Sequence, residues 1–334
     1  MVRLKIVATA LMLTMGSVSV SQAAEYTIRF SHIHPPGATS KSIAAEYFAD
    51  ELEARSEGRI EVRLHPSGEL FGDQQGIQAL QGGVIEMLAP STALLTTIAP
   101  EIGVLDLPFL IEEGQVLADV IQPGTKIHDL IYENENFLSR NIRVIDLWDY
   151  GHKHIWTNTE TRSYGDLRGQ QLRVVGGSDP LRFMMQAWDI NPTGMALGEV
   201  YNGIQQGVID GFDNGFISAQ ALSIYEVTDY AVLTNHGYNT FGLLINDRFF
   251  NSLPAELQDL VNEVAAEATA VSAAILEEKS LEAEEHIRAD GSTEFITLSD
   301  EDLALMREAA IPSVWERSAS IIGEDVITEL LEQK

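Results

Sequence analysis

The spacing of apolar residues changes repeatedly near the start of the chain. Tyr26–His32 is a strand candidate, and Arg59–His65 alternates polar and apolar residues as a half-buried strand does. Between them, Ser40–Glu57 carries apolar residues at helical spacing. Asp73–Gln81 predicts a short helix, and Val84–Ala89 a further strand. This βαβαβ beginning predicts a mostly parallel sheet covered by helices.

A seven-residue pattern occurs twice. Leu80–Glu86 resembles Ile204–Asp210: each reads as a helix end, a glycine able to adopt the left-handed conformation, and a strand with an acidic residue at its third position. A chance match is one explanation. A true repeat predicts two α/β domains built on related plans, with a cleft between them of the kind that small molecules occupy.

The last third of the chain has a different character. Pro254 to Ala289 is composed almost entirely of helix-forming residues, and at 1.5 Å per residue such a helix would span about 54 Å, enough to bridge two lobes. The alternative is two consecutive helices with a kink near Ser272. Ser299–Glu308 and Val314–Gln333 predict further helices.

Composition narrows the class of protein. The length of 334 residues suggests roughly two domains, and the 45% apolar content is that of a globular protein. A net charge of −29 would repel phosphate backbones, so nucleic-acid binding is not expected. The absence of cysteine from the sequence excludes disulfides, thiolate metal sites and cysteine nucleophiles.

The N-terminus resembles an export signal. Arg3 and Lys5 precede a mostly apolar stretch, Ile6–Met15, that is too short to span a bilayer. Ser21-Gln22-Ala23 offers small residues at the spacing that a signal peptidase recognises. We predict a signal peptide over residues 1–23, cleaved near Ala23, and a periplasmic mature protein; the alternative, a membrane anchor, would need about 20 apolar residues.

Familiar catalytic motifs are missing from the sequence. It contains no Gly-rich loop with Gly-Lys-Ser/Thr, no G-x-S-x-G and no H-E-x-x-H, which favours a binding protein that needs no cofactor over an enzyme. Two His-x-His pairs, His32/His34 and His152/His154, could grip a metal ion from one face of a strand, although Lys153 disfavours a cation at the second pair. An exported metal-binding protein is therefore the leading alternative, and an exported lyase acting on acidic sugars a weaker one.

One segment points to anion binding. Leu167–Val174 reads as a turn followed by a short strand that carries Arg173. An arginine at a strand end beside a cleft can hold a carboxylate through two parallel hydrogen bonds, which lysine cannot reproduce. Taken alone, the segment would by default be interpreted as placing Arg173 in an ordinary surface ion pair.

Five blocks in a fixed order make a family resemblance. They are Phe30-Ser31-His32; Gly58-Arg59-Ile60 with Pro66-Ser67-Gly68-Glu69-Leu70; Leu105–Leu110; Leu167–Val174; and Glu199-Val200-Tyr201 through Gly207–Gly211 to Asn214. Over essentially the whole mature chain, the sequence resembles the extracytoplasmic solute-binding proteins of TRAP transporters, of the C4-dicarboxylate-binding (DctP) type.

The resemblance implies an α/β, two-lobed periplasmic binding protein fold with mixed sheets, hinge strands and a long connecting helix. We expect lobe I to comprise residues 25–150 and 240–279, and lobe II residues 151–239 and 280–334. The implied function is capture of an organic acid in the cleft between the lobes and its delivery to the permease subunits of a TRAP transporter. The protein is expected to be a monomer and not an enzyme.

The resemblance also implies site residues. The family's carboxylate-clamping arginine falls on Arg173, its asparagine in the D-G-x-x-N stretch on Asn214, and a further cationic position, commonly arginine, on Lys153. Phe212 and Asp213 replace the family's usual Gln-Glu pair, so substrate identity cannot be borrowed from a relative. Further candidates for ligand contact, each of which could instead be a structural residue, are His32, Asp73, Ser91, Trp148, Trp156 and Phe212.

Overall fold

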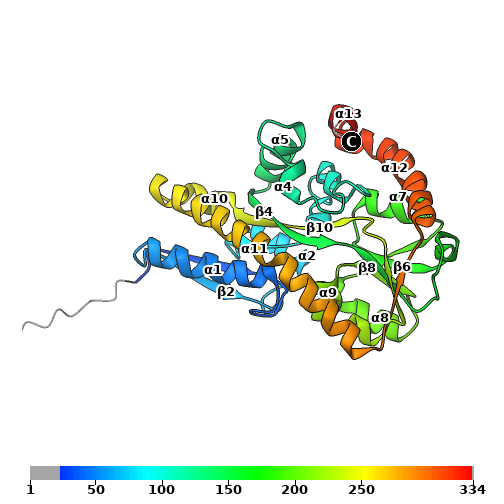
Figure 1. The fold of residues 1–334 in the computed structure, drawn as a ribbon. Coiled ribbons are helices and arrows are strands. Elements are labelled where there is room, and N and C mark those ends of the chain that lie inside the picture. Colours follow the sequence, from blue (N-terminus) through cyan, green and yellow to red (C-terminus); the bar gives the residue numbers. More distant parts are fainter. Residues whose placement is uncertain (1–22, 333–334) are drawn as a thin grey trace, which may run out of the picture.

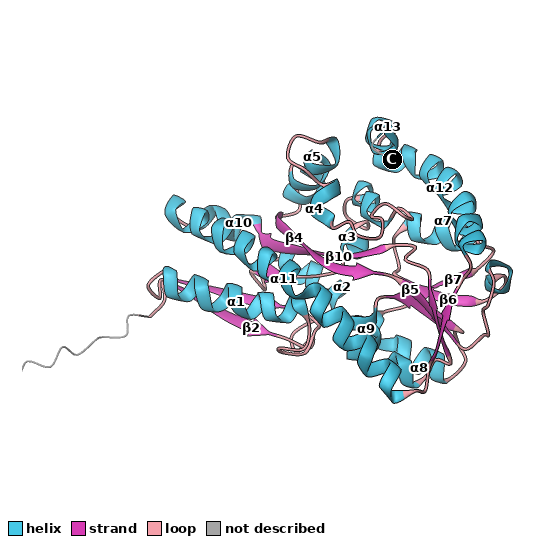
Figure 2. Cartoon of the chain, in the orientation of Figure 1, coloured by secondary structure: helices cyan, strands magenta, loops and turns pink. Residues whose placement is uncertain are grey.

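Two β-sheets form the framework of the protein, which a computed structural model describes over residues 23–332 (Figures 1 and 2). The signal peptide predicted from the sequence lies outside the described residues except for Ala23. Helices flank both sheets, and one long helix runs along both of them. None of the helices within residues 23–332 combines the length and the apolar character needed to cross a membrane.

The first sheet has the strand order β2-β1-β3-β10-β4. Strands β1 and β2 pair in parallel, as do β1 and β3, whereas β10 runs antiparallel to its neighbours β3 and β4. The sheet is therefore mixed, because a strand from late in the sequence inserts between two early ones. The bounds are β1 (Tyr26–Ser31), β2 (Ile60–His65), β3 (Met87–Leu88), β4 (Ile142–His152) and β10 (Tyr238–Asn246).

The second sheet has the order β11-β9-β5-β8-β6-β7 and is also mixed. Strands β8, β6 and β7 are parallel, and β5 runs antiparallel to both β8 and β9. The bounds are β5 (His154–Thr157), β6 (Gln171–Val174), β7 (Asn191–Gly194), β8 (Gly211–Asn214), β9 (Tyr230–Leu233) and β11 (Glu294–Thr297).

The chain passes between the sheets at closely spaced points. Strand β4 leads into β5 through Lys153, and β9 of the second sheet leads back to β10 of the first. These crossings are tied together, since the backbone N–H of Lys153 donates to the carbonyl of Gly237 at 2.8 Å. A paired crossing of this kind is a natural hinge between two lobes.

Shorter helices cover the sheets. Those of the first half are α1 (Ser40–Arg55), α2 (Asp73–Gln81), α3 (Thr92–Leu95), η1 (Pro100–Asp106), α4 (Leu117–Val120), α5 (Lys126–Tyr132) and α6 (Glu135–Leu138). Those of the second half are η2 (Tyr164–Leu167), α7 (Asp179–Ala187), η3 (Leu197–Glu199), α8 (Val200–Gln205), α9 (Phe216–Ala221), η4 (Ile224–Glu226) and α10 (Asp247–Ser252).

The long helix predicted from the sequence is continuous. Helix α11 (Ala255–Asp290) has 36 residues and contacts α1 and β4 beside the first sheet and α9 beside the second. Figure 1 shows it running from the side of α1 and β2 to that of α8 and α9. It does not divide into two helices at Ser272, whose side chain is fully buried.

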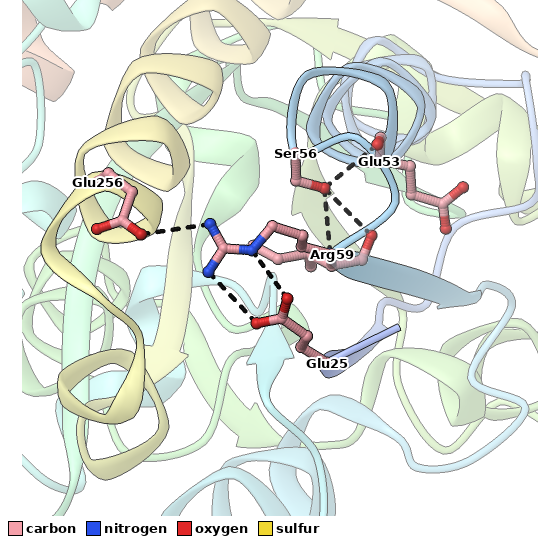
Figure 3. Close-up of polar contacts among 6 residues, drawn as sticks. Glu25, Glu53, Ser56, Arg59 and Glu256 are labelled. Atoms are coloured by element: carbon pink, nitrogen blue, oxygen red, sulfur yellow. Dashed lines mark hydrogen bonds and ion pairs between the residues drawn. The ribbon is translucent and has the colours of Figure 1, made fainter. Parts of the chain in front are cut away.

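Ion pairs fasten the start of α11 to the first sheet (Figure 3). Arg59 donates to Glu25 at 3.1 Å through Nε and to Glu256, in the first turn of α11, at 3.3 Å through Nη1. Beside it, the Ser56 hydroxyl donates to the carbonyl of Glu53 at 3.2 Å and closes the turn between α1 and β2. The N-terminal segment, β2 and the connecting helix therefore meet at one arginine.

The helices at the end of the chain have other boundaries than the sequence predicts. The sequence predicts helices over Ser299–Glu308 and Val314–Gln333, but α12 (Asp300–Ile322) runs through Pro312, and α13 (Glu324–Glu332) follows after Gly323. The helix continues because buried residues on both sides of the proline, among them Met306 and Trp315, share one packed face, and that burial outweighs the hydrogen bond that proline cannot make.

The two copies of the sequence repeat adopt the same turn. Gly83 and Gly207 both have φ +70°, the left-handed region that favours glycine. The acid at the end of each turn then makes equivalent bonds: the backbone N–H of Arg29 donates to Glu86 at 2.8 Å, and that of Gln171 donates to Asp210 at 2.7 Å. The strands β3 and β8 begin only after these acids, so β3 is shorter than Val84–Ala89.

The predicted lobe boundaries assign most strands of the first sheet to lobe I and those of the second sheet to lobe II. The exact boundaries remain a prediction. Strand β4, which ends at His152, straddles the boundary at 150, as β10 does the boundary at 240. The C-terminal helix α13, assigned to lobe II, contacts α5 in the segment assigned to lobe I.

Candidate functional site

A cavity of about 760 Å³ is lined by segments associated with both sheets. The first half of the chain contributes loops after β1 and β2, the start of α2 and the segment after β3; the second half contributes β6, β8 and the loops after β6 and β7. The carboxyl ends of parallel strands are a usual place for a ligand in α/β folds. The ionisable and amide side chains among its lining residues are Asp73, Gln74, Gln75, Lys153, Arg173, Asp213, Asn214 and Asn239.

Arg173 lies on β6 with 4% of its surface exposed. Its Nε donates to the carbonyl of Met195 at 2.9 Å, and no carboxylate within residues 23–332 lies at ion-pair distance from the guanidinium. Burial lowers the pKa of Arg173 to about 10, against the influence of Asp213 and Asp73, so the side chain stays charged at neutral pH. A buried cation without an ion-pair partner is suited to receive an anion from the cavity.

Lys153 also lines the cavity, but its charge has a partner. The ammonium lies 3.3 Å from the carboxylate of Asp213 on β8, and both side chains are almost completely buried. Burial alone would raise the pKa of Asp213, but Lys153, His236 and Arg173 outweigh it and hold the pKa below its usual value. His236 Nε2 lies 3.7 Å from the same carboxylate, and burial lowers the pKa of His236, so the imidazole is neutral at pH 7.

Asn214 ends β8 with its side chain oriented by two donors. Its Oδ1 accepts from the backbone N–H of Gly215 at 2.9 Å and from Asn239 Nδ2 at 2.7 Å. Because the Gly215 backbone group can only donate, the oxygen must face it. The amide nitrogen of Asn214 is then the group left to donate to a molecule in the cavity.

Asp73 and Ser91 line the cavity from the first half of the chain. Asp73 begins α2, and its Oδ1 is buried with no hydrogen-bond partner among the described residues. Burial raises the pKa of Asp73, and Lys41 acts against this rise. Ser91 forms an isolated bridge with Phe241 of β10, which fixes that wall.

His32, Trp148 and Phe212 are not among the residues that line the cavity, and contact between them and a ligand remains a prediction. Trp148 is fully buried and donates its indole N–H to Thr269 of α11 at 3.1 Å. Phe212 packs in the core, because it alternates with Asp213 along β8 and therefore points to the opposite face. His32 is 2% exposed, and burial lowers its pKa to about 3.

The second tryptophan near Lys153, Trp156, lies in the core and contacts the backbone at the end of β8. Trp156 is fully buried and donates its indole N–H to the backbone carbonyl of Asn214 at 2.9 Å. It belongs to the core and not to the cavity lining.

Lys41 is a cation that sequence reasoning missed. It is fully buried, donates to the carbonyl of Ala89 at 3.2 Å and stands 3.4 Å from the centre of the Phe241 ring. Its only sequence signal is a lysine in the first turn of a predicted helix, a position where lysine is usually solvated. Asp213, by contrast, was visible as a replacement inside the D-G-x-x-N stretch.

The two histidine pairs lie in packed surroundings. Within residues 23–332 no three His, Asp or Glu side chains gather in an arrangement that could hold a metal ion. His34 instead shares a hydrogen bond with the hydroxyl of Tyr150 at 3.0 Å, and His154 packs on the ring of Phe216. These histidines are part of the packing around the cavity.

A two-lobed α/β framework with an anion-receptive cavity is the architecture of a solute-binding protein. The sequence profile described as "Bacterial extracellular solute-binding protein, family 7" (DctP) matches residues 30–320, and the chain belongs to this family. The resemblance inferred from the five sequence blocks is confirmed. The match is to a binding protein of a transport system and not to an enzyme, which decides against the lyase.

Individual relatives agree with this assignment. The chain is 32% identical over 321 residues to the C4-dicarboxylate-binding periplasmic protein DctP of Rhodobacter capsulatus, covering 96% of this chain and 94% of the relative. A TRAP periplasmic solute-binding protein from Sulfurospirillum deleyianum with bound succinate superposes with a TM-score of 0.84 at 28% identity, covering 93% of this chain and all of that one. Another from Desulfovibrio salexigens, with bound orotic acid, gives a TM-score of 0.84 at 27% identity, covering 92% of this chain and 97% of that one. The predicted two-lobed fold with mixed sheets is confirmed.

Proposed function

We propose that this protein captures an organic acid in the cavity between its two sheets and delivers it to the permease subunits of a TRAP transporter. The observation that carries the proposal is Arg173, a charged and buried guanidinium that lines the cavity without an ion-pair partner among the described residues. A carboxylate is the planar anion that matches the donors of a guanidinium.

The other lining residues extend this contact. Asn214 offers a neutral donor for a second carboxylate oxygen or a hydroxyl group, and Ser91 adds a hydroxyl to the cavity lining from the first half of the chain. The succinate and orotic acid in the related structures are both acids, which supports an acid as the ligand here. We further propose that the protein works in the periplasm as a monomer after cleavage near Ala23.

The first experiment is a thermal-shift panel of organic acids on the protein lacking residues 1–23. A ligand that binds the folded state raises the apparent stability by RT ln(1 + [L]/Kd), so a binding acid raises Tm in a concentration-dependent way. A parallel titration with divalent metals tests the metal-binding alternative. A rise in Tm with metals and with none of the acids would contradict the proposal.

The second experiment tests Arg173 by calorimetric titration of an acid from the panel that binds. Removing one partner of a buried charged pair costs about 3–5 kcal/mol, so Arg173→Ala should lose about two to four decades of affinity. Arg173→Lys should recover only part of this, because one ammonium does not replace two parallel N–H donors. If Arg173→Ala is folded by circular dichroism and binds within threefold of wild type, Arg173 is not the carboxylate clamp.

A further inference from the structure

We infer that the cavity is built for a singly charged acid: one carboxylate held by Arg173, and a hydroxyl or N–H group, in place of a second carboxylate, donated to Asp73. This inference rests on the proposed function and names its ligand class. It departs from the C4-dicarboxylate named for the Rhodobacter capsulatus relative.

The charges that line the cavity balance before a ligand arrives. Among the described lining residues the cations are Arg173 and Lys153, and the acids are Asp73 and Asp213. A dicarboxylate would bring two further negative charges into a buried site whose formal charge is zero. Desolvating an anion without a matching cation is strongly unfavourable.

Lys153 cannot serve as a free second cation. Its ammonium is 3.3 Å from the Asp213 carboxylate, and both side chains, which line the cavity, are almost completely buried. Asp106 adds a further negative charge nearby: burial raises its pKa to about 6, against the lowering influence of Lys153, and it is mostly ionised at pH 7. A second carboxylate that approached Lys153 would meet Asp213 at the same place.

Lys41 is also not accessible to the ligand. Its ammonium lies behind the wall, bonded to the carbonyl of Ala89 and covered by the ring of Phe241, and it is absent from the cavity lining. The acidic residue that lines the cavity on this side is Asp73. Its Oδ1 is buried without a hydrogen-bond partner among the described residues, so the carboxylate has acceptor capacity that the protein does not use. A carboxylate acceptor that shares the cavity with Arg173 favours a ligand that carries a donor as well as a carboxylate.

The other described residues that line the cavity carry no ionisable side chain that could alter this balance. Leu94, Val175, Met195, Leu222 and Phe241 supply apolar surface to the same cavity. They can cover a hydrocarbon or ring body between the two polar ends.

The test compares acids that share a skeleton and differ at one end. We would titrate three sets calorimetrically: 4-hydroxybutyrate, butyrate and succinate; 4-(hydroxymethyl)benzoate, 4-methylbenzoate and terephthalate; galactonate and galactarate. In each skeleton that fits, we expect the hydroxylated monoacid to bind at least tenfold more tightly than the diacid. In the first two sets the unsubstituted monoacid should fall between them.

Variants locate the cause of the preference. Asp213→Asn releases Lys153 and should reduce the ratio of monoacid to diacid affinity at least tenfold. Asp210→Asn is the matched control, because it is the same substitution at a residue outside the cavity lining, where the carboxylate accepts from the backbone N–H of Gln171. The ratio of monoacid to diacid affinity in this variant should equal that of wild type. If Asp213→Asn fails to fold, Asp73→Asn provides the second arm: it should weaken the exclusion of diacids while its amide oxygen still accepts the ligand's hydroxyl.

The outcomes separate this inference from the proposed function. Tighter binding of the diacid than of the hydroxylated monoacid to wild type overturns the inference and leaves the proposed function standing. An unchanged ratio in folded Asp213→Asn and Asp73→Asn overturns it as well. If no acid in any set binds, the proposed function fails, and the inference fails with it.

Discussion

Two buried lysines differ in their surroundings: Lys153 lines the cavity, and Lys41 packs against Phe241, one of the lining residues. Lys153, at the crossing between the sheets, has its ammonium 3.3 Å from the carboxylate of Asp213. Lys41, on α1, has no carboxylate of residues 23–332 within ion-pair distance and is held by a backbone carbonyl and an aromatic ring. Burial lowers the pKa of Lys41 to about 7, against the influence of Asp73.

The difference shows that burial alone does not decide whether a charge is stabilised. The attraction between opposite charges falls with distance, while the cost of desolvation is set by depth. A lysine in contact with its acid forms part of the structure that holds the hinge. A lysine beyond contact distance carries its desolvation cost largely uncompensated and readily gives up its proton near neutral pH.

The largest effect is expected for Lys153→Met. The substitution leaves Asp213 buried without its ion-pair partner, and such losses cost about 3–5 kcal/mol of folding free energy. Adding Asp213→Asn should recover most of this, because the remaining group is neutral. Urea unfolding of the two variants measures the difference; a single variant as stable as the double one would show that the ion pair has no structural role.

Asp106 comes next, since it faces the same lysine. Its carboxylate accepts from Ser178 at 2.6 Å, and burial raises its pKa from 3.8 to about 6. The folded state therefore binds more protons than the unfolded chain between about pH 4 and 6, so this group lowers stability as pH rises through that window. Asp106→Asn should stabilise the protein by up to about 3 kcal/mol at pH 7.

The control for the Asp106→Asn prediction is the pH dependence of the stability that the substitution adds. The gain from Asp106→Asn should vanish below about pH 4, where the wild-type carboxyl is protonated in both states. Urea midpoints measured from pH 4 to 7 test this. A gain that is the same at every pH would assign the effect to packing rather than to ionisation.

Lys41→Met should have the opposite sign to Lys153→Met. With the pKa of Lys41 lowered from 10.5 to about 7, the unfolded chain binds more protons between those values, so wild-type stability rises with pH across that window. Replacing a poorly compensated buried charge by an apolar side chain should add about 2 kcal/mol at pH 7 and flatten the rise. The control is Lys279→Met on α11, where the lysine side chain is 25% exposed and pairs with Glu282. Destabilisation by Lys41→Met alone would contradict the contrast.

The smallest change in stability is expected at the two repeated turns. One of them contains a partly exposed ion pair, which can be compared with the buried pair of Lys153 and Asp213. Glu86 and Asp210 both accept from a backbone N–H, but among residues 23–332 only Glu86 also binds a cation, Arg29, whose side chain is 40% exposed. Glu86→Gln should therefore cost more than Asp210→Asn by up to about 1 kcal/mol. Thermal unfolding at low and at high salt should show this excess shrinking as salt screens the pair.

Much of the fold followed from local patterns. Helix α2 begins and ends at the predicted residues, and the single helix over Ala255–Asp290 departs from its predicted range by one residue at each end. The turns at Gly83 and Gly207 also followed, because a left-handed position after a helix is a strong local preference for glycine. The break predicted around Pro312 failed, since the packed face of α12 overrides a local penalty.

For the site, the sequence by itself determined which residues could bind an acid: Arg173 at a strand end and Asn214 in the D-G-x-x-N stretch are both found in the cavity lining. Only the tertiary structure decided which charges are free. Asp213 lies sixty positions from Lys153 and reaches it because β8 pairs with β5, while Trp148 and Phe212, close by in sequence, turn into the core. The energy of a pair of charges depends on the distance between them and on their burial, and the position of residues in the sequence gives neither quantity.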